Sequence, residues 1–316
     1  MCTYNGAEFL RAQLESILAQ SRAPDEIIIC DDGSTDQTTN LLNRHASARI
    51  KIHINQQNLG SVKNFEQAIS MCTGDVIALS DQDDVWHHDK LQMIEEAFRA
   101  NPAAGLVFSD AEIADENLHP LNRRMWNEVG FDAHKRKLVR TGRALEVLIS
   151  GWTVTGATMA FRSNFRNLAL PIPTEIAMIH DGWIALTIAA VAKVVMIEEP
   201  LIKYRQHGRQ QIGAPTRTQA STNPDGIGAA LRRRNNTADL HKILTTLAER
   251  LSANAHLYDT RTALSFVSDY SFHLNVRANL PQRRLNRLPS ILRELLSLRY
   301  HEYANGFKSA AKDLVS

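Results

Sequence analysis

Three carboxylates within four positions, Asp81, Asp83 and Asp84, follow almost directly on the apolar run 76–79. The run is short and partly β-branched, which predicts a buried strand. Carboxylates this close raise one another's pKa unless a cation or hydrogen bonds compensate. Because ligands bind at the carboxyl ends of strands in an open α/β sheet, the stretch predicts a divalent cation that holds a phosphate-bearing substrate. The alternative is a solvated acidic turn that caps the next helix.

Three further segments carry polar side chains at positions where an α/β sheet collects its ligand-binding turns. They are Thr3-Tyr4-Asn5-Gly6, Asp31-Asp32-Gly33-Ser34, and Asn58-Leu59-Gly60 with Lys63-Asn64. Each also has a purely structural interpretation. Asp31 and Asp32 are compatible with capping of the helix that follows, and Tyr4 is compatible with a core aromatic.

A later carboxylate, Asp181, lies between His180 and Trp183, just before an apolar helix expected over 184–191. Partial desolvation would raise its pKa toward a value useful for a general base. The N-terminus of the helix favours the anion and acts in the opposite direction. The sequence leaves this balance open, together with the alternative that Asp181 is an ordinary N-cap. His207 is likewise either a functional or a structural histidine.

Strands and helices alternate along the first part of the chain. Apolar runs predict strands at 25–30, 50–54, 76–79 and 105–109, and helical periodicity predicts helices at 7–20, 37–45, 61–72 and 88–100. The polar segment 115–140 predicts a mobile loop over the site. Beyond it we expect a helix at 143–150 and strands at 153–161, 193–197 and 201–204. This alternation is typical of an α/β protein with a doubly wound, largely parallel sheet.

The expected first strand is missing from this pattern. A sheet of this kind opens with a strand, whereas only Met1-Cys2 precede the turn at Thr3. Either the start codon is assigned too late, which we favour, or the strand is lost. A real loss would make the protein an inactive pseudoenzyme.

The composition is that of a globular protein, with 44% hydrophobic and 22% charged residues among 316. Three cysteines, Cys2, Cys30 and Cys72, show no metal-binding spacing, and their odd number argues against a disulfide framework. A reducing, cytoplasmic location is therefore expected. No apolar stretch reaches 18 residues and no signal-peptide pattern opens the chain, so we expect no membrane span.

Charge divides the chain into two parts. Residues 217–316 hold 15 Lys and Arg against 8 Asp and Glu, a net +7, whereas the remaining residues hold 21 and 26, a net −5. We predict an α/β domain at 1–215, a linker at 216–236 and a basic helical C-terminal extension at 237–316.

The basic extension interleaves arginines and leucines between residues 283 and 299. This amphipathic, cationic pattern suits peripheral contact with an anionic membrane, and a solvated helix face is the alternative. Binding of nucleic acid is not expected, because the arginines lack the clustered aromatic residues that base stacking needs.

Five motifs, TYNG, DDGSTD, SDQDDVW, HDGW and YRQHG, occur in this order. As a set they resemble the family-2 inverting glycosyltransferases of the GT-A fold, in particular their bacterial rhamnosyltransferase-like branch, over about residues 1–215. The resemblance implies a GT-A type mixed sheet flanked by helices. It also implies transfer of a sugar, with rhamnose as the leading candidate, from a nucleotide-diphosphate donor to a cell-surface polysaccharide or a lipid-linked acceptor.

The resemblance also implies roles for single residues at the donor site. Tyr4 would lie against the nucleobase, and Asp32, with Asp31 beside it, would accept a hydrogen bond from the pyrimidine edge. Lys63 stands where relatives often have arginine, near the base or the diphosphate. There it supplies a point charge in place of a two-pronged donor.

The remaining roles concern the reaction itself. Asp81 and Asp83 match the DxD pair: one would bind the ribose or the metal, and the other would bind Mg²⁺ or Mn²⁺ directly. Asp181 would be the catalytic base, and His207 would close over the diphosphate. The competing activity is that of a sugar-phosphate nucleotidyltransferase, which should carry a glycine-rich basic loop where this chain has only Tyr4-Asn5-Gly6.

Overall fold

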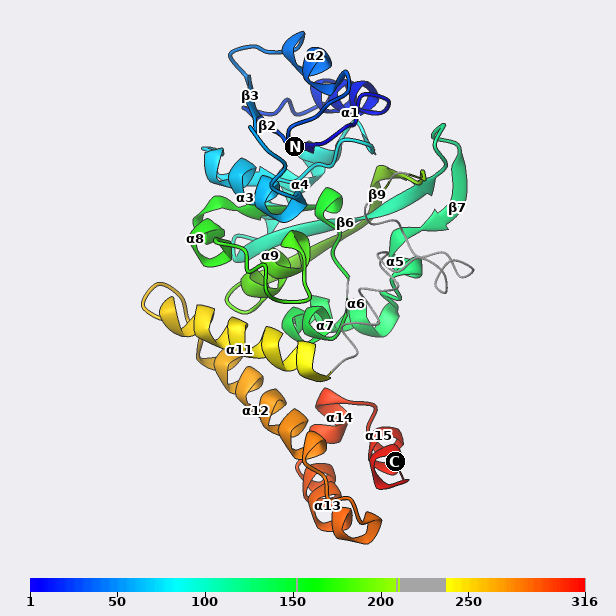
Figure 1. Cartoon of the computed structure of the whole chain (residues 1–316), viewed down its shortest axis with the longest axis vertical. Helices are drawn as coiled ribbons and strands as arrows, with labels where there is room; N and C mark the ends of the chain where they lie inside the picture. The colour runs from blue at the N-terminus through cyan, green and yellow to red at the C-terminus, as the bar shows by residue number, and fades with distance from the viewer. Residues whose placement is uncertain (152, 209, 211–236, 316) are drawn as a thin grey trace. The chain divides into compact units, whose positions relative to one another are not determined.

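The computed structural model describes residues 1–151, 153–208, 210 and 237–315. The chain separates into two compact units, Met1–Arg232 and Arg233–Ser316. In the described residues the first unit combines strands and helices and the second is helical (Figure 1). The predicted α/β class with a C-terminal helical part is confirmed, and the predicted linker at 216–236 lies outside the described residues.

A small parallel sheet opens the first unit. Its order is β1 (Cys2–Thr3), β2 (Ile27–Asp31) and β3 (Ile50–Ile54). A first strand is thus present, two residues long, where the sequence predicts only a turn. All five residues of β2 are buried, which explains its run of three isoleucines. Helices α1 (Leu10–Leu18), α2 (Thr38–Asn43) and α3 (Ser61–Met71) complete this region.

The larger sheet is mixed. Its strands are β4 (Val76–Ala78), β5 (Val85–Trp86), β6 (Ala104–Ala114), β7 (Pro120–Arg124), β8 (Met159–Arg162) and β9 (Lys193–Arg205). The order is β4-β8-β6-β9-β5, with β7 paired to β6. β6 and β9 are parallel, but β8 runs antiparallel to both β4 and β6. The mixed sheet that the resemblance implies is therefore present, and the parallel sheet expected from the alternation is wrong for this part. The amide of Cys2 donates to the carbonyl of Ser80 at 3.2 Å and joins the two sheets.

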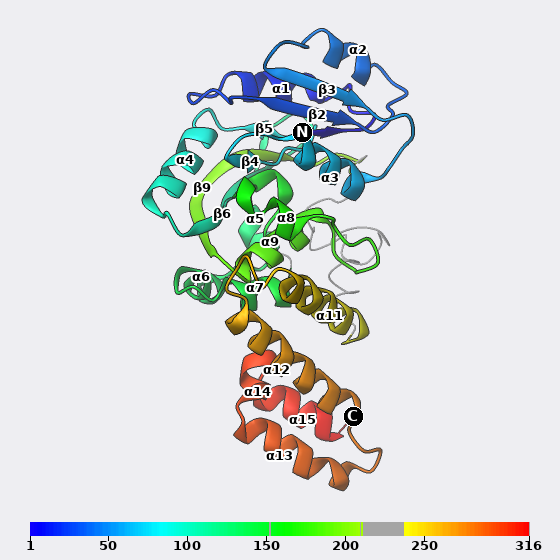
Figure 2. The same cartoon turned by 90° about the vertical axis from the view of Figure 1, so that its left-hand side faces the viewer.

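Helices α4 (Lys90–Ala100) and α9 (His180–Ala189) lie on opposite sides of β6 and β9 (Figure 2). Ile94 and Phe98 of α4 belong to the same core cluster as Val107 of β6. On the other side, a Cβ at Gly105 would come within 2.7 Å of Ile188 Cγ2. Glycine at this position lets α9 approach the strand closely.

Four sequence predictions need correction here. Residues 115–140 form no single loop but hold β7, α5 (Met125–Glu128) and α6 (Ala133–Arg140). The strands expected at 193–197 and 201–204 are one strand, β9. The strand expected at 153–161 begins only at 159, after the 3₁₀ turn η1 (Gly156–Thr158), and α9 begins at 180 instead of 184. α7 (Ala144–Ser150), η2 (Ser163–Phe165) and α8 (Arg166–Ala169) complete the unit.

Aromatic side chains attach the 115–140 segment to β6 and explain why it forms defined elements instead of a loop. The ring of Trp126 lies 5.6 Å from that of Phe108 on β6, and the ring of Phe131 lies 5.7 Å from it. The amide of Trp126 also donates to Asp110 Oδ1 at 3.0 Å. Two buried rings outweigh the polar composition on which the loop prediction was based.

The second unit consists of α11 (Thr237–Ala253), α12 (Arg261–Ala278), η3 (Arg284–Arg287), α13 (Leu288–Leu296), α14 (Arg299–Tyr303) and α15 (Phe307–Val315). Ile291, Tyr300 and Ala310 form a core cluster between the last three helices. Two polar pairs add to it. In the buried pair, His273 Nδ1 lies 2.7 Å from Glu294 Oε2, and in a half-buried pair Arg277 Nε donates to Asp313 Oδ2 at 2.6 Å. Among the described residues, no helix is both long and apolar enough to cross a bilayer.

Candidate active site

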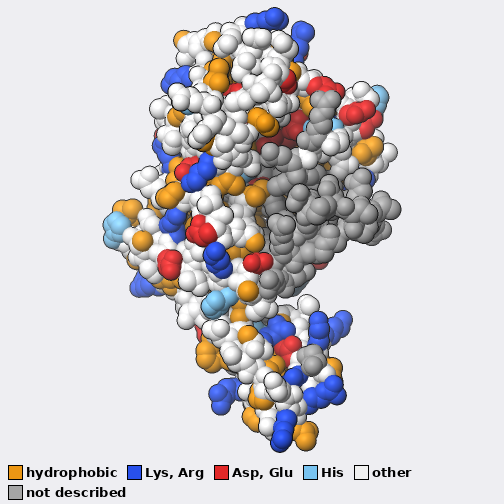
Figure 3. All heavy atoms as spheres, viewed as in Figure 1, with side chains coloured by type: hydrophobic (Ala, Val, Ile, Leu, Met, Phe, Trp, Pro, Cys, Tyr) orange, Lys and Arg blue, Asp and Glu red, His pale blue; other side chains and the backbone are white. Residues whose placement is uncertain are grey.

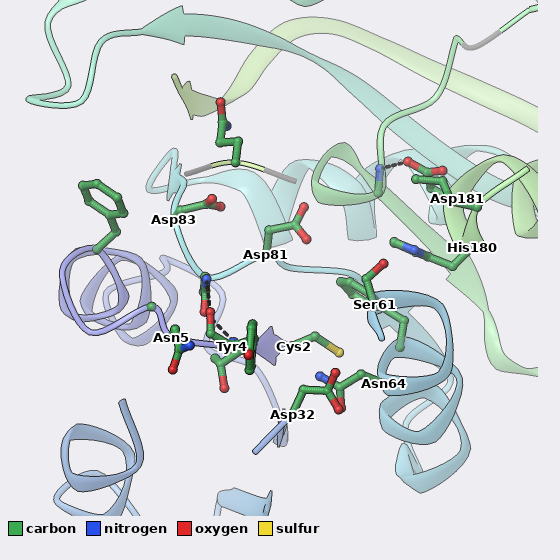
Figure 4. A pocket seen from close by; sticks show the side chains of 18 of the residues that line it. Cys2, Tyr4, Asn5, Asp32, Ser61, Asn64, Asp81, Asp83, His180 and Asp181 are labelled. Carbon is green, nitrogen blue, oxygen red and sulfur yellow. Dashed lines mark hydrogen bonds between the residues drawn. The ribbon is translucent and has the colours of Figure 1, made fainter. Parts of the chain in front are cut away.

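A cleft of about 340 Å³ opens where the two sheets meet. Residues after β1, β2 and β4 line it, together with the first turns of α3 and α9 and the end of β9 (Figure 4). Six of the eight residues predicted for the site lie in this one cleft: Tyr4, Asp32, Asp81, Asp83, Asp181 and His207. The chain thus brings together side chains from positions 4 to 207, as a ligand site at the carboxyl ends of strands requires.

The acid turn, Asp81–Asp84, follows β4. Burial, and then the charge of Asp83, raise the pKa of Asp81 to about 7. Burial and both neighbouring carboxylates raise the pKa of Asp84 well above its ordinary range. The Oδ2 atom of Asp84 is buried without a hydrogen-bond partner in the described chain. No side chain caps the N-terminus of α4, so the helix-capping alternative for this turn is wrong.

His207 holds Asp83 from the end of β9. Its Nε2 atom lies 2.9 Å from Asp83 Oδ2, and its ring packs 4.4 Å from that of Phe9. Arg205 Nε donates to the backbone carbonyl of Asp83 at 2.7 Å, and the guanidinium lies 4.6 Å from the Phe9 ring centre. The sequence analysis singled out neither Phe9 nor Arg205, although Arg205 is part of the YRQHG motif.

Gln82 fixes the turn that carries Tyr4. The amide of Tyr4 donates to Gln82 Oε1 at 2.8 Å, and Gln82 Nε2 donates to the carbonyl of Tyr4 at 3.0 Å. A Cβ at Gly6 would lie 2.1 Å from Gln82 Oε1, so a larger residue there would displace the Gln82 amide. The Tyr4 side chain is 40% exposed, so its interpretation as a core aromatic is wrong. Gln82 was missed, although it lies within the predicted acid motif.

Asp32 lines the cleft with its carboxylate held in a fixed orientation. Its Oδ1 atom accepts hydrogen bonds from the amide of Leu59 at 2.8 Å and from Asn55 Nδ2 at 2.9 Å. Its Oδ2 atom accepts from the amide of Gly60 at 2.9 Å. The Asn58-Leu59-Gly60 turn, which the sequence analysis selected, therefore positions Asp32 at this edge.

Two predicted donor-binding residues lie outside the residues that line the cleft. Asp31 is fully buried, and its Oδ2 atom accepts from Thr3 Oγ1 at 2.7 Å and Ser34 Oγ at 2.6 Å. Lys63 pairs with Glu66, its Nζ atom lying 3.0 Å from both carboxylate oxygens. The helix that follows Asp31 and Asp32 has no side-chain cap, so neither residue has the capping role that the sequence left open.

Asp181 occupies the first turn of α9 and is 3% exposed. Its Oδ2 atom accepts a hydrogen bond from the amide of Gly156 at 3.0 Å, and its Oδ1 atom accepts from the amide of Gly182 at 2.6 Å. The N-cap residue of α9 is Ile179. Asp181 is therefore not the N-cap, and its carboxylate is oriented from two sides within the cleft.

His180, next to Asp181, is a cleft residue to which the sequence analysis gave no role. Its ring stacks on that of Phe65, with centres 4.0 Å apart and an interplanar angle of 15°. Burial lowers its pKa to about 3, so the imidazole is neutral. Phe65 lies on α3, more than a hundred residues away in sequence, and no local pattern connects the two.

The described residues contain no group of three or more His, Cys, Asp or Glu side chains that could hold a metal ion. Asp81 and Asp83 nevertheless fit a hard cation. Burial, and then the charge of Asp83, raise the pKa of Asp81, and a bound positive charge would favour its ionised form. Mg²⁺ is commonly bound by one or two carboxylates together with substrate phosphates, and this number of ligands matches the pair.

The fold is similar to solved glycosyltransferase structures. A crystal structure of S. aureus TarS in complex with UDP-GlcNAc superposes with a TM-score of 0.57 over 98% of this chain and 89% of that one, at 13% identity. A second S. aureus TarS structure gives 0.55, over 96% of this chain and 49% of that one, also at 13% identity. Identity this low establishes the fold alone, which is the GT-A type.

The chain belongs to glycosyl transferase family 2, whose model matches residues 1–167. An uncharacterized glycosyltransferase of Nostoc sp. is 31% identical over 65% of this chain. The dTDP-rhamnosyl transferase RfbG of Shigella flexneri is 28% identical over 81% of this chain and 88% of that protein. An Escherichia coli beta-1,3-glucosyltransferase, WfgD, is 33% identical over 29% of this chain. The matched segments span 63% of the Nostoc protein and 37% of WfgD. The predicted family and fold type are confirmed.

Proposed function

We propose that the protein transfers a sugar from a nucleotide-diphosphate donor to a hydroxyl of a glycan acceptor, with inversion at the anomeric carbon. One observation carries the proposal: the acid turn and Asp181 line the same cleft, on elements a hundred residues apart. The acid turn suits a diphosphate with its cation, and the opposite carboxylate suits a base for the acceptor.

Donor binding uses the edge formed by β1, β2 and the acid turn. The exposed ring of Tyr4 provides a stacking surface for the nucleobase. Asp32 lies beside it and would accept from the pyrimidine edge. Asp31 and Lys63 do not line the cleft, so Asp31 would act through Ser34, and a contact of Lys63 with the donor stays a prediction.

Asp81 and Asp83 would hold a divalent cation, Mg²⁺ or Mn²⁺, which stabilises the negative charge of a departing diphosphate as a Lewis acid. His207 would help to enclose the diphosphate, because it contacts Asp83 and Phe9 at the mouth of the cleft. Divalent-cation use is common among transferases of this fold, and the oxygen donors of the acid turn are the ligands that such ions prefer.

Asp181 would be the general base. It takes the proton from the acceptor hydroxyl as that oxygen attacks the anomeric carbon. The bond between the anomeric carbon and the diphosphate oxygen breaks, and the nucleoside diphosphate leaves with the bonding electron pair. A single in-line attack inverts the configuration and needs no covalent carboxylate, so one base is enough.

We further propose that the sugar is rhamnose and that the acceptor is a cell-surface polysaccharide or its lipid-linked precursor. The support is the name of two relatives: RfbG is a dTDP-rhamnosyl transferase, and WfgD acts on a diphosphoundecaprenol-linked sugar. The motifs of the rhamnosyltransferase-like branch favour the same sugar.

A lipid-linked acceptor gives a reason for peripheral contact with an anionic membrane, at the inner face of the cytoplasmic membrane. The C-terminal unit carries an exposed apolar row, the leucine face, formed by Leu285, Leu288, Leu292 and Leu296. Leu285 is 79% exposed and Leu296 is 84% exposed. Exposed Lys and Arg lie among hydrophobic side chains on this unit (Figure 3). Such a face suits insertion between anionic headgroups.

The test of the transfer proposal is a panel of nucleotide-diphosphate sugars with Mg²⁺ or Mn²⁺. Each donor is first scored for a rise in melting temperature and then for release of nucleoside diphosphate with an acceptor glycan. We expect one nucleotide class to stabilise the protein and one sugar to be transferred. Absence of both effects for every donor would contradict the proposal, and incorporation of a nucleoside triphosphate into sugar phosphate would support the nucleotidyltransferase instead.

A further inference from the structure

Lys90, the first residue of α4, has no exposed side-chain surface. Lysines are almost never fully buried, because taking an ammonium group out of water costs several kcal/mol unless partners compensate. The proposed transfer reaction does not use Lys90. Its contacts show why it lies inside the protein.

The Nζ atom of Lys90 donates a hydrogen bond to the backbone carbonyl of Ala157 at 2.6 Å. It also lies 3.8 Å from the ring centre of Trp86, within cation–π range. The side chain thus spans from α4 across β5 to the 3₁₀ turn η1. One buried hydrogen bond therefore ties that turn to α4.

The charges that face Lys90 come from the acid turn. Asp84 and Asp81 both favour its protonated form, whereas burial acts against it and lowers its pKa to about 7. The charge of Lys90 is therefore coupled to the two carboxylates of the acid turn. Burial and the charges of Asp83 and Asp81 raise the pKa of Asp84, and the charge of Lys90 acts against them. The Oδ2 atom of Asp84 has no hydrogen-bond partner among the described residues.

The η1 turn held by Lys90 contacts Asp181 directly. Gly156, the residue before Ala157, donates its amide to Asp181 Oδ2 at 3.0 Å. The turn also packs tightly on the start of α9, since a Cβ at Gly156 would lie 3.1 Å from His180 Nε2. Any displacement of Ala157 would therefore move the amide that orients the Asp181 carboxylate.

We propose that Lys90 is a positioning residue that ties the η1 turn to the start of α4 and thereby holds Asp181 in the geometry needed for attack on the donor. The inference rests on the proposed function, in which Asp181 is the base. Lys90 touches neither donor nor acceptor. Its loss should reduce the rate of transfer and leave donor binding nearly unchanged.

The experiment compares Lys90→Met and Lys90→Gln with the wild type, in the presence and absence of Asp181→Asn. Methionine has a side chain of similar length but lacks both the N–H groups and the charge of lysine. Glutamine keeps an N–H group and lacks the charge. Lys193→Met is the matched control, because Lys193 is exposed and its Nζ atom bonds Asn101 outside the cleft. We expect Lys90→Met to lower kcat about ten- to a hundredfold with donor KM within about threefold, in the range of a misplaced catalytic group.

Two further readouts separate positioning from simple destabilisation. In the Asp181→Asn background, Lys90→Met should cost less than about threefold, because residues that act as a unit are not additive. Hydrogen exchange of the amides at 156–158 should accelerate at least tenfold in Lys90→Met and stay unchanged in Lys193→Met.

Equal losses of kcat in both backgrounds, or unchanged exchange at 156–158, would overturn the inference. So would failure of both Lys90 variants to fold, since Lys90 would then be a residue of stability only. Failure of the proposed function is a separate outcome, because it appears as a wild type without transfer or as a fully active Asp181→Asn variant.

Discussion

Asp81 is the residue at which burial and like charge act most directly on the proposed site. Its folded pKa of about 7 lies above its ordinary value of 3.8. Between these two pH values the folded state binds more protons than the unfolded state, so stability falls as pH rises through the window. A bound cation would reverse this dependence of stability on pH.

The substitution Asp81→Asn should therefore stabilise the cation-free protein at high pH. In a chelating buffer, we expect the variant to melt at a higher temperature than the wild type at pH 8. The difference should shrink as pH falls toward 4, where the wild-type carboxyl is also neutral. Melting curves at unit pH steps measure it. A variant that melts at or below the wild-type temperature at pH 8 would show that Asp81 carries no such repulsion.

Asp181→Asn addresses the other side of the cleft. Asparagine has the same shape and keeps one of the two acceptor oxygens of Asp181, but it cannot take a proton at neutral pH. We expect donor affinity to stay within about threefold and transfer to fall by about 10²–10⁴, the usual contribution of a general base. The matched control is Asp132→Asn, because Asp132 caps α6 away from the cleft and accepts from the amide of Lys135. Normal turnover by Asp181→Asn would exclude it as the base.

Among the elements, the leucine face of η3 and α13 supports a separate prediction. Burial of one leucine contributes about 1.5–3 kcal/mol, and a juxtamembrane basic residue contributes about 1 kcal/mol. Leu292→Ser with Leu296→Ser should therefore reduce flotation with anionic liposomes at least tenfold. The matched control is Leu257→Ser, an exposed leucine between α11 and α12.

The ionic strength of the buffer tests the electrostatic part of the same prediction. Wild-type flotation should weaken as salt increases, because the Debye length shortens. Flotation that is absent at low salt, or equal for the double variant and the wild type, would make the leucine face an ordinary solvated surface.

Elements set by local pattern could be predicted from the sequence. The runs Ile27–Ile29 and Val76–Leu79 predict β2 and β4, and amphipathic spacing predicts α1, α3 and α4. Elements set by distant partners could not. β7 and α5 depend on rings that pack against β6, and the direction of β8 depends on its neighbours β4 and β6.

The same distinction applies to the site. The residues found by motif, such as Asp83 and His207, meet in the cleft. Phe9 and Phe65 could not be predicted as site residues, because their role depends on contacts with histidine rings that are distant in sequence. Lys63 differs from them: a match by position predicts it at the donor, and in the structure it forms an ion pair with the neighbouring Glu66.

For the whole molecule, the division of charge accompanies a division of structure. The acidic part holds the α/β unit with its cleft, and the basic part holds the helical unit with the leucine face. We propose donor chemistry for the first and membrane contact for the second. These assignments are independent, since removal of the leucine face should leave nucleotide binding in solution unchanged.

The central claim is that the acid turn binds a divalent cation and that this cation binds the diphosphate of the donor. Calorimetric titration of a nucleoside diphosphate, UDP or dTDP, with and without Mn²⁺ tests it in the wild type, in Asp83→Asn and in Asp89→Asn, the last an exposed neighbour outside the cleft. We predict that Mn²⁺ tightens binding at least tenfold in the wild type and Asp89→Asn but leaves Asp83→Asn unaffected. Equal affinities with and without Mn²⁺ in the wild type, or a full effect of Mn²⁺ in Asp83→Asn, would contradict the claim.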